Sequence, residues 1–213
     1  MSFNFEELSK LVIEGDTDAI KPAVKNAIND GVDPLEIVDK GLAKGIRTVG
    51  EKYGKGEIFL TELLMGAEAM KVGMEIINPE IQKQKKEVKK LGSMVIGTVS
   101  GDIHDLGKNI VSALFSAHGF DVTDLGVDVP DEKFIEKIKE LKPDILGLSA
   151  LMTSTIIKQR DIINTLKETG LRDKVKVMVG GAAVNEDFVR EIEADGYAEN
   201  ANDAVTIAKD LLK

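Results

Sequence analysis

The sequence predicts an α/β protein with an all-α N-terminal domain, in which a four-helix bundle precedes a parallel sheet. Two observations predict this class. Apolar residues recur at helical spacing through about the first 80 residues, and from Ser93 short β-branched runs alternate with helical stretches. The 213 residues are 43% hydrophobic and 31% charged, an ordinary globular composition that suits one large domain or two small ones.

Four apolar patterns and their capping residues define the N-terminal helices. Asp16 or Thr17 suits the N-cap of the second helix, and Asp33 followed by Pro34 suits the start of the third. Short connections between amphipathic helices favour a bundle, which we expect over residues 1–81 as a cap domain. The patterns are Phe5, Leu8 and Val12; Ile20, Val24 and Ile28; Leu35, Val38, Leu42, Ile46 and Val49; and Phe59, Leu63, Ala67, Met70, Met74 and Ile77.

Residues 82–91 are expected to separate two domains. They include the stretch QKQKKEVKK, which holds five Lys, with Val88 as its one core-sized apolar residue. A run of like charges is typical of a solvated segment, so we interpret residues 82–91 as an interdomain linker, with a basic docking strip as the alternative. The second domain is then expected over residues 92–213.

Strands and helices alternate through this second domain. About 120 residues with five strands fit the flavodoxin-like (Rossmann-like) fold, whose strand order is 2-1-3-4-5 and whose ligands bind where that order reverses, between strands 1 and 3. The strands are expected at Met94–Val99, Asp121–Leu125, Ile145–Ser149, Val175–Val179 and Gly196–Ala198, and the helices at Asp105–His118, Asp131–Leu141, Thr155–Thr169, Asn185–Ala194 and from Asp203 onward.

Three loops leave the carboxyl ends of these strands: Ser100–Gly107, Ser149–Thr155 and Gly180–Ala183. They hold a histidine, flanking carboxylates, a cluster of hydroxyls and a glycine pair. Topology therefore places a ligand site between the first two loops. Small residues in the loops let a bulky ligand approach the backbone; these are Gly101, Gly107, Gly180, Gly181 and Ala182.

His104 is the candidate metal ligand. It lies two residues after Asp102 and directly before Asp105, and a carboxylate bonded to one imidazole nitrogen leaves the other nitrogen free for a metal. One imidazole cannot build a zinc cage, but it can supply an axial ligand to a metal held in a macrocycle such as haem or corrin. The alternative is a surface-loop His with a local hydrogen bond. His118, before Gly119 at a helix end, is assigned no chemistry.

Composition argues against several other classes. The net charge of −9 disfavours binding to the nucleic-acid backbone, and 4% aromatic residues without Trp disfavour base stacking. The absence of Cys excludes disulfides, iron–sulfur clusters and thiolate nucleophiles. No signal peptide or membrane-length apolar run is visible, so we expect a cytoplasmic protein without a membrane partner.

The segment Asp102-x-His104-x-x-Gly107 resembles the corrinoid-binding domain of cobalamin-dependent methionine synthase and of the methyl-carrier corrinoid proteins of methylamine and methanol methyltransferase systems. Three further segments match in order: DLGVDVP (124–130), GLSALMTST (147–155) and VGGAAV (179–184). The stretch VGEKYGKGEIFLTELLMGAEAM (49–70) resembles the helical cap of the same family. The resemblance spans nearly the whole chain.

The resemblance implies a cobalamin or related corrinoid bound base-off, with its lower base displaced from cobalt and His104 as the lower axial ligand. It also implies that Asp102 and Thr155 extend a hydrogen-bond relay from His104, with Thr155 standing where the family often has Ser. His104, Asp102 and Thr155 are thus the candidate catalytic residues.

Other candidate cofactor-binding residues follow from the same resemblance. Ser149 and Thr153 match positions along the buried nucleotide tail, and Gly180 and Gly181 match the glycine pair over which the tail passes. The remaining candidates in the loops are Gly101, Ile103, Asp105, Gly107 and Leu151.

Tyr53 and Leu60 match cap residues that cover the upper face of the cobalt. Methionine synthase has Phe at the Tyr53 position, so the phenol is a departure that alters the shielding of the methyl group. Phe59 is adjacent to this face or belongs to the bundle core. The cap must move aside for a partner, and residues 82–91 are expected to act as its hinge.

The function implied is that of a corrinoid protein that carries a methyl group on cobalt between methyl-Co(III) and Co(I) in one-carbon metabolism such as methanogenesis. A substrate:corrinoid methyltransferase would load it from a methylamine, methanol or a methoxylated compound. A corrinoid:thiol or corrinoid:pterin methyltransferase would unload it, and a reductive activation protein is a further candidate partner. With no room for a catalytic barrel, the chain is expected to be non-catalytic alone.

Three alternatives stay open from the residues. A cobalamin-sensing regulator would need a basic DNA-binding headpiece, whereas the chain up to Ile81 carries 9 basic and 15 acidic residues. A phospho-receiver would need an Asp at the end of strand 3, where Ser149 stands. A flavin protein would need a hydroxyl-rich phosphate loop after strand 1.

Overall fold

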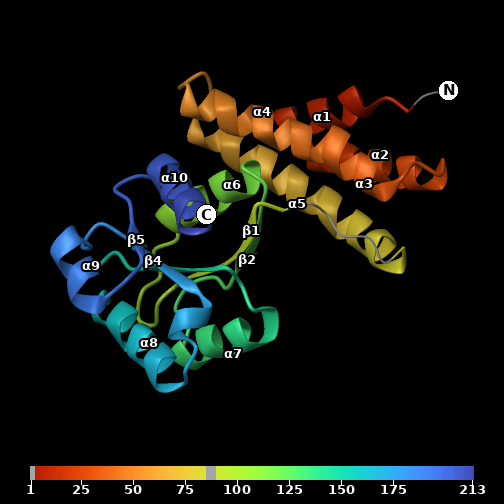
Figure 1. Cartoon of the computed structure of the whole chain (residues 1–213). Coiled ribbons are helices and arrows are strands. Elements are labelled where there is room, and N and C mark those ends of the chain that lie inside the picture. The colour runs from red at the N-terminus through yellow and green to blue at the C-terminus, as the bar shows by residue number, and fades with distance from the viewer. Residues whose placement is uncertain (1–2, 85–89) are drawn as a thin grey trace. The chain divides into compact units, whose positions relative to one another are not determined.

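The computed structural model describes residues 3–84 and 90–213, which divide into two compact units (Figure 1). The first unit comprises Met1–Lys90 with Ser116–Gly119, and the second comprises Leu91–Phe115 with Phe120–Lys213. A helical N-terminal part followed by a five-stranded sheet confirms the predicted fold class. Among the described residues, no helix combines the length and apolar character that crossing a bilayer requires.

Capping residues start the helices of the first unit where the sequence indicates. The Asp16 side chain accepts a hydrogen bond from Ala19 N at 2.8 Å, and that of Asp33 accepts one from Leu35 N at 2.9 Å. The third apolar pattern folds as one helical run with a π-helical middle. The helices are α1 (Phe5–Glu14), α2 (Thr17–Asn29), α3 (Pro34–Glu36), η1 (Ile37–Leu42), α4 (Ala43–Gly54) and α5 (Leu60–Lys83).

Glycines let these helices pack more closely than the apolar patterns suggest. A Cβ on Gly45 of α4 would lie 2.6 Å from the carbonyl oxygen of Ser9 in α1, and one on Gly73 of α5 would lie 2.9 Å from Leu42. The buried face of α5 includes Gly66 and Gly73. Of the predicted α5 stripe, Leu63 and Ile77 are fully buried, whereas Ala67, Met70 and Met74 are half-buried.

Two expectations for the last helix of the first unit differ from the structure. Phe59 lies just before the helix, since its backbone N–H donates to Glu62 Oε2 at 2.8 Å, as expected at a helix start. Its side chain is 81% exposed and so lies outside the core. Helix α5 continues to Lys83, two residues into the expected linker 82–91. The central part of that linker, residues 85–89, lies outside the described residues.

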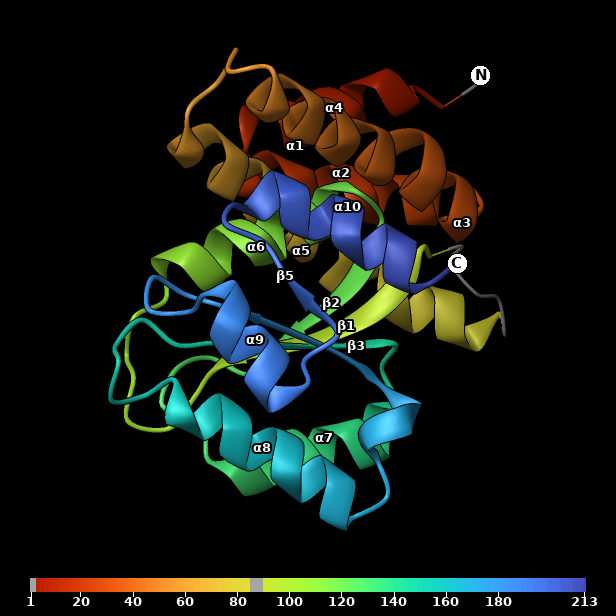
Figure 2. The same cartoon turned by 60° about the vertical axis from the view of Figure 1, so that its left-hand side comes forward.

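The second unit confirms the predicted strand order, β2-β1-β3-β4-β5 with parallel neighbours (Figure 2). Observed boundaries lie within about two residues of the expected ones, the usual uncertainty at element ends. The strands are β1 (Gly92–Thr98), β2 (Phe120–Asp124), β3 (Ile145–Ser149), β4 (Lys176–Gly180) and β5 (Gly196–Tyr197), and the helices are α6 (Leu106–Ala117), α7 (Asp131–Leu141), α8 (Ile157–Glu168), η2 (Arg172–Lys174), α9 (Glu186–Ile192) and α10 (Ala201–Leu211).

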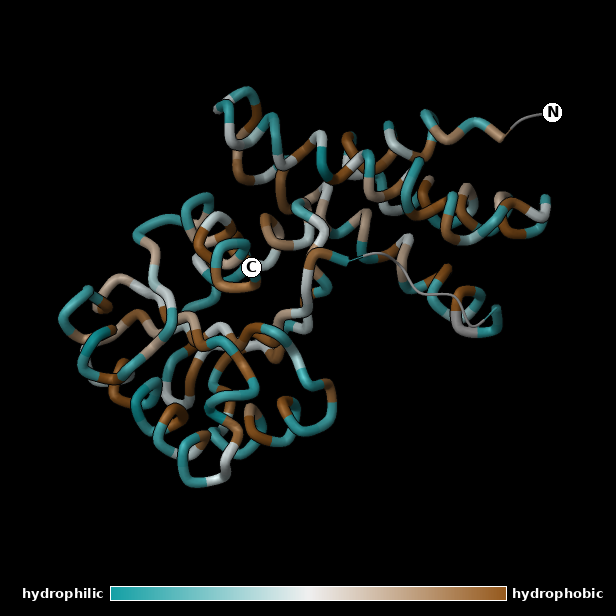
Figure 3. Tube along the Cα trace, in the orientation of Figure 1, coloured by the Kyte–Doolittle hydropathy of each residue, from teal (hydrophilic) through white to brown (hydrophobic). Residues whose placement is uncertain are grey.

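Helices cover both faces of the sheet, and the neighbouring strands β1 and β3 are buried through nearly continuous runs rather than at alternate residues (Figure 3). Val95, Leu146 and Val177 point into one core with apolar residues of α7, α8 and α9. Met94 and Ile96 point to the opposite face, where α6 and α10 lie (Figure 2). Burial on both faces fixes the register that brings the loops after β1 and β3 together.

Gly45→Ala tests the glycine packing of the first unit. The added methyl group meets backbone and Val12 on α1, so we expect a loss of about 1–3 kcal/mol in the free energy of unfolding. Gly54→Ala is the matched control, since its Cβ meets nothing within 4 Å, and it should stabilise by about 0.5 kcal/mol. Urea unfolding measures both, and equal effects of the two substitutions would contradict the packing.

Candidate functional site

The loop after β1 turns sharply before it reaches His104. Val99, just beyond the strand, pairs with Val129 in an isolated parallel bridge, and its carbonyl oxygen accepts a hydrogen bond from Asp102 N at 3.2 Å. Between them Gly101 has a φ of 81°, which suits the third position of a type II turn and favours glycine. This turn directs the Asp102 side chain into the protein.

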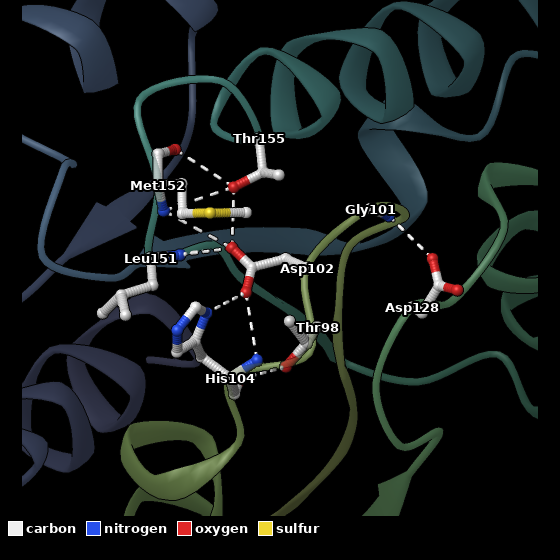
Figure 4. Close-up of polar contacts among 8 residues, drawn as sticks. All are labelled: Thr98, Gly101, Asp102, His104, Asp128, Leu151, Met152 and Thr155. Carbon is white, nitrogen blue, oxygen red and sulfur yellow. Dashed lines mark hydrogen bonds and ion pairs between the residues drawn. The ribbon is translucent and has the colours of Figure 1, made fainter.

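The Asp102 carboxylate is fully buried and is surrounded by hydrogen-bond donors (Figure 4). Its Oδ1 atom accepts from the backbone N–H of His104 at 3.0 Å and lies 2.7 Å from the His104 Nδ1 atom. Its Oδ2 atom accepts from Leu151 N and from Thr155 Oγ1, both at 2.7 Å. The donors come from the loops after β1 and β3, so one carboxylate joins both loops.

The balance of burial and hydrogen bonding keeps Asp102 ionised. Burial alone would raise the pKa of Asp102, but the bonds from Thr155, His104 and Leu151 outweigh burial and hold the pKa far below its usual range. An ionised carboxylate can only accept hydrogen bonds, so the His104 Nδ1 atom carries a proton. In neutral imidazole the lone pair then lies on Nε2, the atom turned away from Asp102.

His104 itself is exposed, with 49% of its side-chain surface accessible to solvent. Its carbonyl oxygen accepts a hydrogen bond from Thr98 Oγ1 at 3.0 Å, which fixes the backbone beneath the ring. Among the described residues no cluster of three or more His, Cys, Asp and Glu could hold a metal ion. At this point the geometry offers one exposed imidazole, that of His104.

Thr155 anchors the loop after β3. Its Oγ1 atom lies 2.7 Å from Asp102 Oδ2 and 3.0 Å from the carbonyl oxygen of Met152, with Met152 N at 3.3 Å as donor. The hydroxyl is buried, two residues before α8 begins. One side chain thus ties the Asp102 carboxylate to the start of a helix.

The glycine pair at the end of β4, Gly180 and Gly181, lies against the same loop. Gly181 has a φ of 126°, and a Cβ there would lie 1.7 Å from the carbonyl oxygen of Ala150, so only glycine fits. A Cβ on Gly180 would meet nothing within 4 Å. Nearby, Gln159 Nε2 donates to the carbonyl oxygens of Leu148 and Gly180, both at 3.0 Å, while its buried Oε1 has no partner among residues 3–84 and 90–213.

The loops after β1 and β3, with the first residue of α6, also present apolar side chains to solvent. They are unusually exposed for their size: Ile103 is 73% exposed, and Leu106, Leu151 and Met152 are also exposed. Such side chains mark a binding surface more often than a freely solvated one. Together with the open side of Gly180 and the unpartnered Gln159 acceptor, they fit a large, mostly apolar ligand that carries polar groups.

The remaining predicted site residues fall outside the hydrogen-bonded centre. Asp105 accepts from Asn109 Nδ2 at 3.2 Å and so turns toward α6. Ser149 supplies its carbonyl oxygen to Val99 N at 3.0 Å, Thr153 is exposed, and a Cβ on Gly107 would meet nothing within 4 Å. Tyr53 and Leu60 are half-buried in the first unit.

Sequence reasoning missed three groups around the centre. The backbone N–H of Leu151 and that of Met152, at 3.4 Å, donate to Asp102, and no residue type signals a backbone donor. Asp128 binds Gly101 N at 2.7 Å. Lys108, buried on α6, pairs with Asp124 at the end of β2. Asp124 and Asp128 both lie in the segment DLGVDVP, so the match of this segment to the family is the sequence signal that could have indicated them.

The fold and the site define a doubly wound α/β protein whose candidate ligand site, with one exposed imidazole, lies at the switch point of the sheet. Residues 92–206 match the family described as B12 binding domain, and residues 5–78 match a second family with the same description. Because the first match covers more than half of the chain, the chain belongs to the B12-binding family.

Relatives narrow the family further. Trimethylamine corrinoid protein 2 of Methanosarcina mazei is 48% identical over 202 residues, which are 95% of this chain and 93% of that protein. Dimethylamine corrinoid protein 2 of Methanosarcina acetivorans is 47% identical over 207 residues, 97% and 95% of the two chains. The crystal structure of the methanol:cobalamin methyltransferase complex of Methanosarcina barkeri matches with a TM-score of 0.85 at 36% identity, covering 98% of this chain and 79% of that one.

Asp102→Asn tests the buried carboxylate. The Asn side-chain NH2 group would face the N–H and O–H groups that now donate to the Asp102 carboxylate. We therefore expect a loss of about 1.5–3 kcal/mol in the free energy of unfolding at pH 7. Because the folded pKa lies below the unfolded value of about 3.9, the stabilisation is present above about pH 4 and is lost as the pH falls toward the folded pKa. The difference between wild type and variant should therefore shrink in acid.

Urea unfolding of the cofactor-free protein between pH 7 and pH 3 measures this difference. Asp187→Asn is the matched control, since the Asp187 side chain is 91% exposed and pairs with Arg190 on the surface of α9. It should change stability by no more than about 0.5 kcal/mol at any pH. A difference between wild type and Asp102→Asn that stays constant with pH would contradict the assigned ionisation.

Proposed function

We propose that this chain is the corrinoid subunit of a multi-component methyltransferase, and that it carries a methyl group between two partner enzymes. The observation that carries the proposal is the orientation of His104. A buried, ionised Asp102 holds Nδ1 and leaves Nε2 free on an exposed apolar surface. When bound, the corrinoid would supply a cobalt centre that accepts and releases a methyl group.

His104 would hold the cobalt through Nε2, and Asp102 and Thr155 would act on the imidazole through the hydrogen bond to Nδ1. A carboxylate on Nδ1–H increases the electron density that the imidazole offers a metal, as such hydrogen bonds do at other metal sites. Thr155 donates a hydrogen bond to Asp102, so its hydroxyl would reduce the negative charge that the carboxylate presents to the His104 imidazole. The three side chains would therefore set how strongly the imidazole nitrogen binds the metal.

The other loops would hold the rest of the corrinoid. Ser149 and Thr153 follow β3 and would line the nucleotide tail, with Gly180 and Gly181 beneath it. The open Cβ direction of Gly180 supports this assignment, because a larger side chain there would occupy the space beside the strand end. Gly101, Ile103, Asp105, Gly107 and Leu151 would contact the macrocycle from the first two loops.

The first unit would shield the cobalt from solvent. Tyr53, near the end of α4, and Leu60, the first residue of α5, are the residues proposed to face it. Residues 82–91 would then act as the hinge between the cap (1–81) and the corrinoid domain (92–213). Exclusion of water from the reactive cobalt is the physical purpose of such a cap.

A methylamine is the donor we propose, since the names of the similar trimethylamine and dimethylamine corrinoid proteins favour it over methanol or a methoxylated compound. The partners would be a substrate:corrinoid methyltransferase and a corrinoid:thiol or corrinoid:pterin methyltransferase, with a reductive activation protein and a cytoplasmic location also proposed.

Incubation of the reduced, corrinoid-loaded protein with candidate methyltransferases and labelled mono-, di- and trimethylamine tests the donor. Label should reach the protein-bound corrinoid from one amine, and transfer from methanol alone would contradict the proposal.

His104→Ala tests the axial ligand. Wild-type protein reconstituted with cobalamin should bind one corrinoid and show the absorption spectrum of imidazole ligation, whereas His104→Ala should bind the corrinoid without that ligation. His118→Ala is the matched control, since His118 follows α6 outside the Asp102 network. An unchanged spectrum in His104→Ala would remove this residue from the role.

A further inference from the structure

The segment 124–130, between β2 and α7, takes no part in the relay proposed above, yet it contacts the turn that carries Asp102. Asp128 makes two hydrogen bonds to that turn. Its Oδ1 atom accepts from Gly101 N at 2.7 Å, and its backbone N–H donates to the carbonyl oxygen of Asp102 at 2.9 Å. Figure 4 shows the Asp128 carboxylate facing Gly101. One residue thus holds the Ser100–Gly101 peptide group at the centre of the turn and the Asp102–Ile103 peptide group that follows Asp102.

Asp128 is presented from a segment that is itself fixed to β1. Thr98 N donates to the carbonyl oxygen of Gly126 and Val129 N donates to that of Thr98, both at 3.0 Å. Asp128 lies between these anchors with a φ of 51°, in the left-handed region that Asp and Asn tolerate better than most residues. Such a conformation persists only where neighbouring bonds hold it.

The same segment also holds the other end of the His104 loop. Lys108, at the start of α6, has only 2% of its side chain exposed and pairs with Asp124. The second oxygen of Asp124 accepts from Gly126 N at 2.9 Å, which orders the residues that lead to Asp128. The loop that carries Asp102 and His104 is therefore attached to the β2–α7 segment before and after the histidine.

We propose that Asp128 is a positioning residue for His104. Its carboxylate captures the Gly101 N–H and so fixes the plane of the turn, which aims the Asp102 carboxylate at the imidazole and at the donors of the β3 loop. Without it, the turn has one fewer attachment and Asp102 can rotate away from Nδ1. The proposal deepens the proposed function, because the imidazole positioned is the one assigned to cobalt, but its effect on His104 precedes any cofactor.

Three variants separate the carboxylate from the backbone conformation. Asp128→Gly removes the carboxylate acceptor, and glycine adopts a positive φ without strain. Asp128→Asn keeps an acceptor oxygen, and Asn also tolerates a positive φ. Lys142→Gly is the matched control, since Lys142 has a φ of 47° between the end of α7 and the start of β3, at the amino ends of the strands and so away from His104. Asp128 is exposed, so the variants should fold.

The first measurement uses corrinoid-free protein labelled with ¹⁵N. In Asp128→Gly we expect the Gly101 amide to exchange about tenfold faster or more, and the His104 Nδ1 resonance to leave its hydrogen-bonded position. Asp128→Asn should restore both signals, and Lys142→Gly should match wild type. The proposal is overturned if the His104 nitrogen resonances in Asp128→Gly are those of wild type, or if Lys142→Gly shifts them equally.

The second measurement uses cobalamin-loaded protein at pH 7. The imidazole-ligated fraction should fall in Asp128→Gly, return in Asp128→Asn and vanish in His104→Ala. If wild type shows no imidazole ligation, the proposed function fails, and the nitrogen resonances of the free protein still decide the role of Asp128. If ligation depends on His104 but not on Asp128, the proposed function stands and the positioning role is overturned.

Discussion

A charge buried among hydrogen-bond donors is the constraint on which this structure depends. A buried carboxylate is costly unless donors replace its lost water, and Asp102 finds them in His104, Leu151 and Thr155. These donors belong to two loops that are separated by about 50 residues in sequence. The network therefore joins the loops after β1 and β3 and leaves one nitrogen of one imidazole facing outward. Every functional role assigned to this surface follows from that orientation.

The parallel sheet is what brings the two loops within reach. Thr98 and Ser149, the last residues of β1 and β3, are register partners, and Ser149 in turn pairs with Gly180. Three successive loops therefore leave the sheet at the same level. The close approach of Gly181 to the Ala150 carbonyl then leaves room for no side chain at that position. In the order β2-β1-β3-β4-β5 the strand order reverses between β1 and β3, so the site lies where ligands bind in doubly wound folds.

Much of this arrangement could be predicted from the residues. The strands are apolar and β-branched, their spacing fits the order 2-1-3-4-5, and the pairing of Asp102 with His104 and Thr155 follows from the family resemblance. What could not be predicted depends on backbone atoms and on glycine. The Leu151 N–H has no sequence signature, and the close packing at Gly45 and Gly73 is invisible to a pattern that counts only apolar side chains. Phe59 fits the helix stripe in sequence because an apolar residue before an N-terminus has the same spacing as one inside the helix.

The central claim is that the His104 nitrogen binds cobalt, and one measurement tests it most directly. Electron paramagnetic resonance of the cob(II)alamin-loaded protein reports the nucleus of the axial nitrogen. With natural histidine, each cobalt line should split into three, and with ¹⁵N-histidine it should split into two, because the nuclear spins differ. Since the chain has only two histidines, His118→Ala should keep the isotope effect and His104→Ala should abolish it. A three-line splitting that ¹⁵N-histidine leaves unchanged would show that the cofactor's own base remains on the metal, and would contradict the account.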